Sequence, residues 1–162
     1  MEINRYAPIV LEHEIAVFAP PRQVWERLAQ VEFWSRWHPD IGSAEWTDDE
    51  PMDRRGFRFG VKMFRFNARL RIYDEPLVIG WEARHMFSSH RQVFRLDGDY
   101  RQTVLSSEAS YEGPAMKMMP ERLRDPLARF GQTWLAAIKT NIESARENGV
   151  RLPGARRPGR YR

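Results

Sequence analysis

The sequence predicts an α+β domain in which a curved antiparallel sheet wraps around one long C-terminal helix. Residues 9–18 and most of residues 42–113 place apolar side chains at every second position, which is typical of half-buried strands. From residue 123 onward the apolar residues instead recur every three or four positions, as in an amphipathic helix. Because the helix offers one apolar stripe and the sheet one apolar face, we expect the two to pack together.

The first strand is followed by two short helices. In "IVLEHEIAVF" the apolar positions alternate with glutamates, and Pro20 and Pro21 then end the strand and suit the first turn of a helix. The segments "PPRQVWERLAQ" and "VEFWSRW" form these helices, and Pro39 ends the second one at His38. They carry three tryptophans, which we expect to brace the end of the long helix: Trp25, Trp34 and Trp37.

Six further strands with short connections predict an antiparallel meander with an apolar inner face. Their alternation places Met63, Asp74 and Phe87 on that inner face together with the expected core residues. The expected strand segments are residues 42–48, 56–63, 65–76, 77–87, 90–99 and 102–113.

The long helix is expected to begin with Asp125 as N-cap and Pro126 at its first position. Gly149 suits its C-cap. The expected apolar stripe consists of Leu127, Phe130, Trp134, Ile138, Asn141 and Ala145, and Leu123 extends it upstream.

The chain of 162 residues suits one domain, here residues 1–149, followed by a basic tail at residues 150–162. The tail, "VRLPGARRPGRYR", holds five arginines and no acid, and its composition predicts disorder. Without it the chain is close to neutral, which argues against a specific nucleic-acid partner. There is no cysteine, no signal-peptide pattern and no transmembrane segment, so we expect a cytoplasmic protein of undetermined oligomeric state.

Three segments resemble the START-related polyketide cyclase/dehydrase superfamily, which includes birch-pollen-allergen-like proteins. They are "IAVFAPPRQVWERLAQVEFWSRWHPDI", "IYDEP" and "WLAAIKTNIESAR", and the likeness spans residues 9–148. The resemblance implies a helix-grip fold with a deep apolar cavity between the sheet and the C-terminal helix. Members bind lipids, sterols, quinones, plant hormones or polyketides, and some catalyse cyclisation or dehydration in that cavity.

The expected ligand-binding residues divide into an apolar lining and a few polar groups. His85 and His90 are expected to face each other across a four-residue hairpin loop, "MFSS", at the cavity mouth or at an exposed hairpin end. Met116, Met118 and Met119 are expected near the mouth, as a lid or a plug. The lining is Phe59, Val61, Phe66, Leu70, Ile72, Trp81, Phe94, Phe130 and Trp134, and the polar set is His85, His90, Gln92, Tyr111 and Asn141.

Three functions remain open from the sequence. The first is non-catalytic binding or transport of a hydrophobic small molecule: a lipid, an aromatic compound or a polyketide-like compound. The second is a cyclase/dehydratase whose proton-transfer group is His90, Tyr111 or Asp74, although the place of Asp74 at a strand end also suits a turn. The third is a protein–protein interaction module. The spacing of the four histidines predicts no metal site, and no cofactor motif is found.

Overall fold

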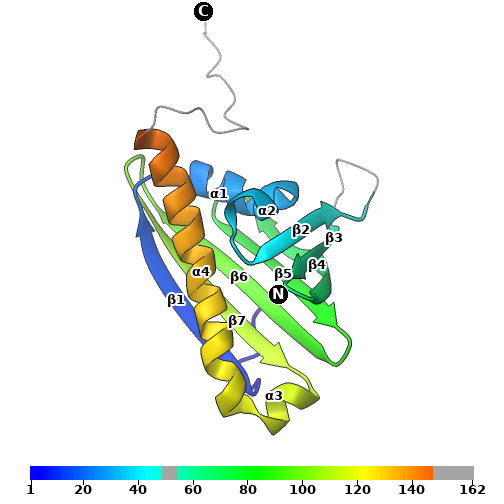
Figure 1. Cartoon of the computed structure of the whole chain (residues 1–162). Coiled ribbons are helices and arrows are strands. Elements are labelled where there is room, and N and C mark those ends of the chain that lie inside the picture. The colour runs from blue at the N-terminus through cyan, green and yellow to red at the C-terminus, as the bar shows by residue number, and fades with distance from the viewer. Residues whose placement is uncertain (49–54, 148–162) are drawn as a thin grey trace, which may run out of the picture.

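The computed structural model describes residues 1–48 and 55–147, and the expected tail and the Gly149 cap lie outside these residues. A seven-stranded antiparallel sheet lies against one long helix, α4 (Figure 1). The strands are β1 (Ile9–Val17), β2 (Ile41–Trp46), β3 (Gly56–Val61), β4 (Phe64–Asp74), β5 (Val78–His85), β6 (Ser88–Gly98) and β7 (Thr103–Glu112). The helices are α1 (Pro21–Ala29), a 3₁₀ turn (Val31–Phe33), α2 (Trp34–Trp37), α3 (Pro114–Met118) and α4 (Pro120–Glu147).

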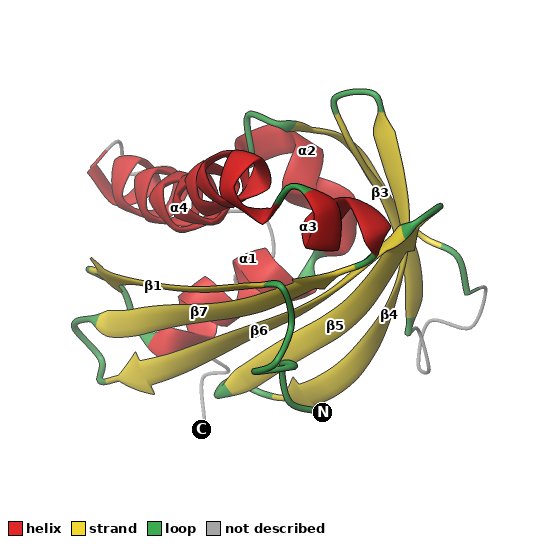
Figure 2. Ribbon diagram, turned by 90° about the horizontal axis from the view of Figure 1, so that it is seen from below, coloured by secondary structure: helices red, strands yellow, loops and turns green. Residues whose placement is uncertain are grey.

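The sheet is a meander whose first strand closes onto its last. Its order is β1-β7-β6-β5-β4-β3-β2, and β1 pairs with β7 from Ile9 opposite Tyr111 to Val17 opposite Thr103. Seen from below, the strands curve around the space beneath α4, and β3 turns upward toward α2, whose Trp34 contacts Phe57 of β3 (Figure 2). The predicted fold class, a curved antiparallel sheet around a C-terminal helix, is therefore confirmed.

An aromatic cluster joins the short helices to α4 and to the sheet. The ring of Trp34 is fully buried, and its centroid lies 5.0 Å from Trp134 on α4 and 5.2 Å from Trp81 on β5. Trp37 lies 5.5 Å from Trp134, and Trp25 is buried on α1. Trp34 and Trp37 therefore pack on the middle of α4 rather than on its end, where the sequence predicted the contact, and Trp25 packs on Tyr73 of β4 instead.

The start of α4 differs from the prediction. The helix begins at Pro120, six residues before its expected first position at Pro126, so Pro126 lies inside it. Leu123 and Leu127, on either side of Pro126 in sequence, pack on a small second core formed by Ile9, Ala109 and Tyr111. This apolar packing stabilises a first helical segment that local preference at the proline disfavours.

A bulge in β4 changes which side chains of that strand lie on the inner face of the sheet. A bulge between Leu70 and Ile72 shifts the register of β4 against β5, and a one-residue shift reverses which side chains point inward. Tyr73 therefore contacts Trp25, with centroids 5.1 Å apart, while Asp74 is exposed. The expected inward placement of Asp74 is wrong.

The hairpin turns correct two further positions. β3 ends at Val61, and β5 ends at His85, before residues that the alternation had placed on the inner face. Met63 and Phe87 lie in or beside the two turns and are 86% and 71% exposed, respectively. The predicted inward orientation of these two side chains is therefore wrong.

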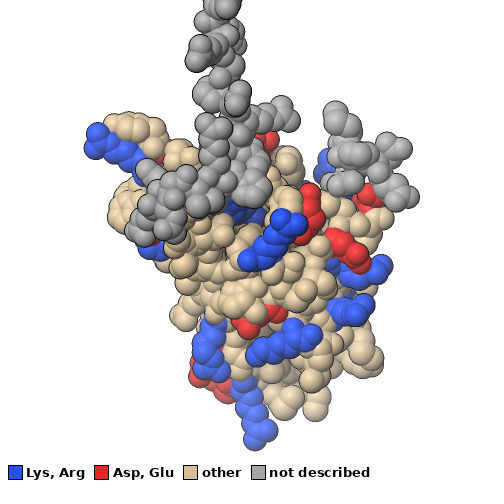
Figure 3. Space-filling model, turned by 45° about the horizontal axis from the view of Figure 1, so that its top comes forward, with Lys and Arg blue, Asp and Glu red and all other residues tan. Residues whose placement is uncertain are grey.

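Charged side chains on the outer surface are mixed in sign. Glu82 pairs with Arg71 and Arg84 at 3.2 Å each, and Glu108 pairs with Arg5 at 3.0 Å and Arg95 at 3.2 Å. On the face shown in Figure 3, basic and acidic side chains lie side by side. Among the described residues, no helix is both long and apolar enough to cross a membrane.

Candidate functional site

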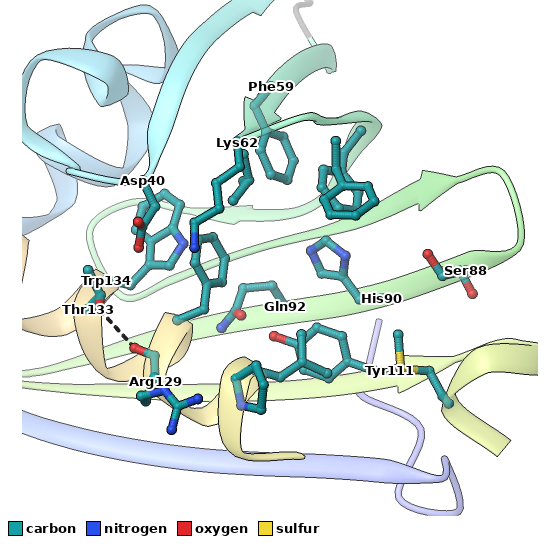
Figure 4. A pocket seen from close by; sticks show the side chains of 18 of the residues that line it. Asp40, Phe59, Lys62, Ser88, His90, Gln92, Tyr111, Arg129, Thr133 and Trp134 are labelled. Atoms are coloured by element: carbon teal, nitrogen blue, oxygen red, sulfur yellow. Dashed lines mark hydrogen bonds between the residues drawn. The ribbon is translucent and has the colours of Figure 1, made fainter. Parts of the chain in front are cut away.

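A pocket of about 520 Å³ lies between the sheet and α4 (Figure 4). Its volume falls within the range of about 300–1,000 Å³ that small-molecule sites occupy. Residues from the α2–β2 connection, from β3 to β7, from the β3–β4 turn, and from α3 and α4 line it. They are Asp40, Phe59, Val61, Lys62, Phe64, Phe66, Trp81, Ser88, Ser89, His90, Gln92, Tyr111, Met116, Pro126, Leu127, Arg129, Phe130, Thr133 and Trp134.

Aromatic rings form the walls of the pocket. Phe59 and Phe66 stack on neighbouring strands with centroids 5.1 Å apart. Trp134 enters from α4 and lies 5.9 Å from Trp81 and 6.5 Å from Phe130. These rings are held by one another and by the buried cluster around Trp34, so the walls are preformed rather than assembled by a ligand.

His90 and Tyr111 form a stacked pair in the pocket. The antiparallel register of β6 and β7 places the two residues opposite each other, and their rings lie 5.5 Å apart at 28°. Burial lowers the pKa of His90 to about 4, so its ring is neutral at pH 7. Burial also raises the pKa of the Tyr111 hydroxyl above its ordinary value. Neither polar group has a hydrogen-bond partner among the described residues, so both are free to meet a neutral polar group.

Gln92 adds an acceptor to the same wall. Its amide nitrogen Nε2 donates to the Ser107 hydroxyl at 2.9 Å and more weakly to the carbonyl oxygens of Glu108 at 3.3 Å and Val93 at 3.5 Å. The described residues donate no hydrogen bond to its carbonyl oxygen Oε1. Gln92 is therefore fixed through its nitrogen and presents its oxygen as the unused acceptor.

A second buried histidine, His38, lies behind the aromatic wall. Its ring centroid is 4.7 Å from Trp134 and 5.4 Å from Phe130, and only 2% of the residue is exposed. Its Nδ1 accepts the backbone N–H of Asp40 at 3.2 Å, while its buried Nε2 has no partner in the described part of the chain. Burial lowers the pKa of His38 to about 4, and the nearby Asp40 carboxylate opposes this shift. His38 is thus a neutral support for the wall.

Most of the residues predicted to bind a ligand do line the pocket. The structure brings together Phe59, Val61, Phe66, Trp81, His90, Gln92, Tyr111, Phe130 and Trp134. Of the three methionines expected near the mouth, Met116 lines the pocket, whereas Met118 and Met119 are exposed.

Other predicted lining residues lie elsewhere. Leu70 and Phe94 are buried in the core beneath the pocket, and Ile72 is displaced by the bulge in β4. Asn141 lines a separate shallow groove between α2 and α4, because the buried stripe of α4 continues through Leu135 and Ile142 instead.

The expected His85–His90 pair across a four-residue loop is also wrong. The turn contains only Met86 and Phe87, so His85 is opposite Ser88 and His90 is opposite Ala83. Both rings contact Phe66, at 5.3 Å for His85 and 5.7 Å for His90. The Nδ1 of His85 lies 2.8 Å from the carbonyl oxygen of Arg65, at the hairpin end and outside the pocket lining. Asp74, the third catalytic candidate, is likewise outside the lining.

Several pocket residues were not predicted from the sequence, for different reasons. Pro126 and Thr133 follow the helical period of Phe130 and Trp134, so extending that period through the helix start would have found them. Lys62 and Asp40 lie at a turn and a helix-to-strand connection, where no periodic pattern assigns a direction to a side chain. Five further pocket residues lie in regular elements and were not predicted as ligand contacts, although Leu127 was expected on the apolar stripe: Phe64, Ser88, Ser89, Leu127 and Arg129.

The pocket offers no cluster of metal ligands. Across residues 1–48 and 55–147, no group of three or more His, Asp or Glu side chains is arranged to hold a metal ion.

Comparison with solved structures identifies several with the same fold. The Zhui aromatase/cyclase from Streptomyces sp. R1128 matches with a TM-score of 0.74 and 19% identity, covering 91% of this chain and 98% of that one. A START superfamily protein from Mycobacterium smegmatis matches with a TM-score of 0.67 and 15% identity, covering 83% and 97%. The di-domain ARO/CYC StfQ from the steffimycin biosynthetic pathway matches with a TM-score of 0.67 and 18% identity, covering 85% of this chain and 46% of that one.

Comparison with family models gives a match over most of the chain. Residues 8–143 match the model described as "Polyketide cyclase / dehydrase and lipid transport". No curated protein matches the sequence. The matched range runs from the start of β1 to near the end of α4 and so contains the sheet, the helix and the pocket between them. The chain therefore belongs to the polyketide cyclase/dehydrase and lipid-transport family and has its helix-grip fold.

Proposed function

We propose that the protein binds or carries a hydrophobic small molecule in the pocket between the sheet and α4. The observation that carries this proposal is a cavity of about 520 Å³ walled by aromatic rings, with a few unsatisfied polar groups on one side. Apolar burial would supply the affinity, at about 25 cal/mol per Å² before ordering costs. His90, Tyr111 and Gln92 would orient a neutral oxygen-bearing group of the ligand. Lipidic, aromatic and polyketide-like molecules can all combine an apolar body with such an oxygen-bearing group.

The low pKa of the His90 ring favours ligand binding over proton transfer as its role. A general base works best when its pKa lies near the working pH, and burial holds the pKa of His90 at about 4. The described residues also provide no carboxylate hydrogen-bonded to its ring that would raise its basicity. A neutral imidazole next to a neutral phenol is suited to sharing hydrogen bonds with a ligand.

The second candidate is a cyclase/dehydratase that uses the same pocket. It is supported by the stacked pair of His90 and Tyr111 and by the likeness to two structures described as aromatase/cyclases. In that case the aromatic walls would fold a flexible polyketide by shape, and His90 or Tyr111 would move a proton. A His90→Gln variant separates the candidates: a binding protein loses affinity only modestly, whereas an enzyme loses turnover of a linear polyketide thioester.

Native mass spectrometry of freshly purified protein tests the leading proposal. We expect a bound small molecule that is released on denaturation. The control is Val61→Trp, which adds an indole to the pocket wall and should lower the bound fraction while the Tm stays within a few degrees. A molecule retained equally by wild type and Val61→Trp would contradict binding in this pocket.

A further inference from the structure

Two cationic side chains lie at the pocket, on opposite sides of it. Lys62 occupies the turn between β3 and β4, and Arg129 lies on α4. Figure 4 shows the Lys62 side chain extending along the pocket from the β3 side, with Arg129 on the α4 side. Both residues are exposed, so the charges lie toward solvent rather than in the aromatic interior.

Among the residues that the structure describes, no neighbouring acid neutralises either cation. On the outer face of the sheet, arginines such as Arg71 and Arg95 pair with glutamates at 3.2 Å. Within the described residues, no carboxylate lies within ion-pairing distance of Lys62 or Arg129. Asp40 is the acid that lines the pocket, and it is paired with neither of them. Two cations and one acid therefore give this part of the pocket a net positive charge.

The interior excludes a charged group. Its walls are aromatic, and its polar groups are neutral: an imidazole, a phenol and an amide. An ionised group moved among them would lose its hydration without gaining a counter-charge, which is strongly unfavourable. A ligand with one charged end would therefore enter with its apolar end first and keep the charged end beside Lys62 and Arg129.

We propose that the ligand of this pocket is an amphipathic anion: an apolar body with a terminal carboxylate or phosphate that is attracted by the positive charges of Lys62 and Arg129. This inference rests on the proposed binding function and narrows it to a class of ligand. It also gives the orientation of the bound ligand: the neutral oxygen-bearing part lies toward His90 and Tyr111, and the anion lies toward solvent.

Two hairpin turns provide a matched pair of variants for Lys62. Lys62 and Met86 both occupy left-handed positions, with φ of 53° and 34°, and asparagine tolerates that conformation well. Lys62→Asn removes the charge and keeps the turn. Met86→Asn places the same residue at a left-handed position of another turn, whose side chain is outside the pocket lining, and removes no charge. On α4, Arg129→Gln is matched by Arg122→Gln, because Arg122 is exposed and does not line the pocket.

The test compares two fluorescent probes that share an apolar body. 1-Anilinonaphthalene-8-sulfonate carries a sulfonate, and N-phenyl-1-naphthylamine lacks it. We expect Lys62→Asn and Arg129→Gln each to weaken sulfonate-probe binding about two- to fivefold, as for exposed ion pairs, and to leave the affinity for the neutral probe unchanged. Met86→Asn and Arg122→Gln should change neither affinity. Added salt should weaken the anionic probe only.

Competition identifies the head group. Decanoate, decyl phosphate and decanol are each used to displace the neutral probe from wild type and from Lys62→Asn. Stronger displacement by either anion than by decanol, reduced in Lys62→Asn, supports the proposal, and the stronger anion identifies the source as carboxylate or phosphate.

Two results would overturn the inference, and they have different meanings. Saturable binding of the neutral probe, with equal displacement by decanol and the anions and no effect of either charge removal, would refute the anionic ligand alone. Failure of both probes to bind wild type would refute the proposed binding function as well. Tm measurements on all four variants show that each is folded in the comparison.

Discussion

At the residue scale, the buried histidines connect the pocket to the stability of the fold. His90 lies in the pocket and His38 lies behind its aromatic wall, and burial lowers the pKa of each to about 4. In an unfolded chain the pKa of histidine is about 6.5. The folded state therefore favours the neutral rings, and the unfolded chain takes up protons first as the pH falls.

We expect the free energy of unfolding to fall as the pH is lowered from about 6.5 toward about 4. The contribution of the two rings is fully present above pH 6.5 and is lost below it, at up to about 1.4 kcal/mol per pH unit for each histidine. Urea unfolding at a series of pH values measures this slope. The double variant His38→Gln/His90→Gln should lose most of it, with a remainder from His13, whose pKa burial also lowers. An unchanged slope in the double variant would show that these rings are not the cause.

The bracing role of the short helices depends strongly on one residue. Trp25 is almost fully buried on α1 and contacts the ring of Tyr73 at 5.1 Å. We expect Trp25→Ala to lower the free energy of unfolding by about 3–5 kcal/mol, as large-to-small core substitutions do. Urea unfolding with Arg22→Ala as an exposed control on the same helix provides the measurement. A loss below about 1 kcal/mol would mean that α1 does not brace the core.

At the element scale, a glycine sets the distance between α4 and β1. Gly131 is buried, and a Cβ at this position would lie 2.9 Å from Cε1 of His13 and 3.0 Å from its Nδ1. The absence of a side chain thus allows the helix to lie directly on the histidine ring. Close approach of this kind is a packing reason for a residue that is otherwise unfavourable within a helix.

We expect Gly131→Ala and His13→Ala to be coupled. In the His13→Ala background, Gly131→Ala should stabilise the protein by up to about 1 kcal/mol, because alanine is the better helix former. In wild type the clash with the ring should remove at least about 0.5 kcal/mol of that gain. A double-mutant cycle by urea unfolding measures the difference. Additive effects would show that the ring moves aside without cost.

The strands and α4 show which features of the fold could be predicted from the sequence and which could not. The strands and the long helix follow from periods of two and three to four, because each has one buried face. The bulge in β4 and the two-residue turn at Met86 and Phe87 were not predictable in this way, since each is one or two residues long and changes no local period. These short features account for the errors at Asp74 and at the His85–His90 pair. Similarly, the start of α4 depends on packing between Leu123, Leu127 and β1, which lies far away in the sequence.

At the scale of the whole molecule, the pocket is the space that remains when the sheet and α4 pack together. The inward direction of Phe59, Trp81, His90 and Tyr111 could be predicted, because strand alternation determines it. The volume could not, since it depends on how closely side chains from distant segments fill the space between the elements. A filled core and a ligand pocket therefore give the same sequence pattern, and the cavity distinguishes them.

Titration with N-phenyl-1-naphthylamine tests most directly whether this pocket takes up an apolar molecule. We expect saturable binding of one probe per chain with a Kd in the micromolar range, and at least about tenfold weaker binding to Val61→Trp, in which an added indole occupies the pocket. The Tm of Val61→Trp must stay close to that of wild type for the comparison. Absence of saturable binding to wild type, or equal affinity for the folded Val61→Trp variant, would contradict the account.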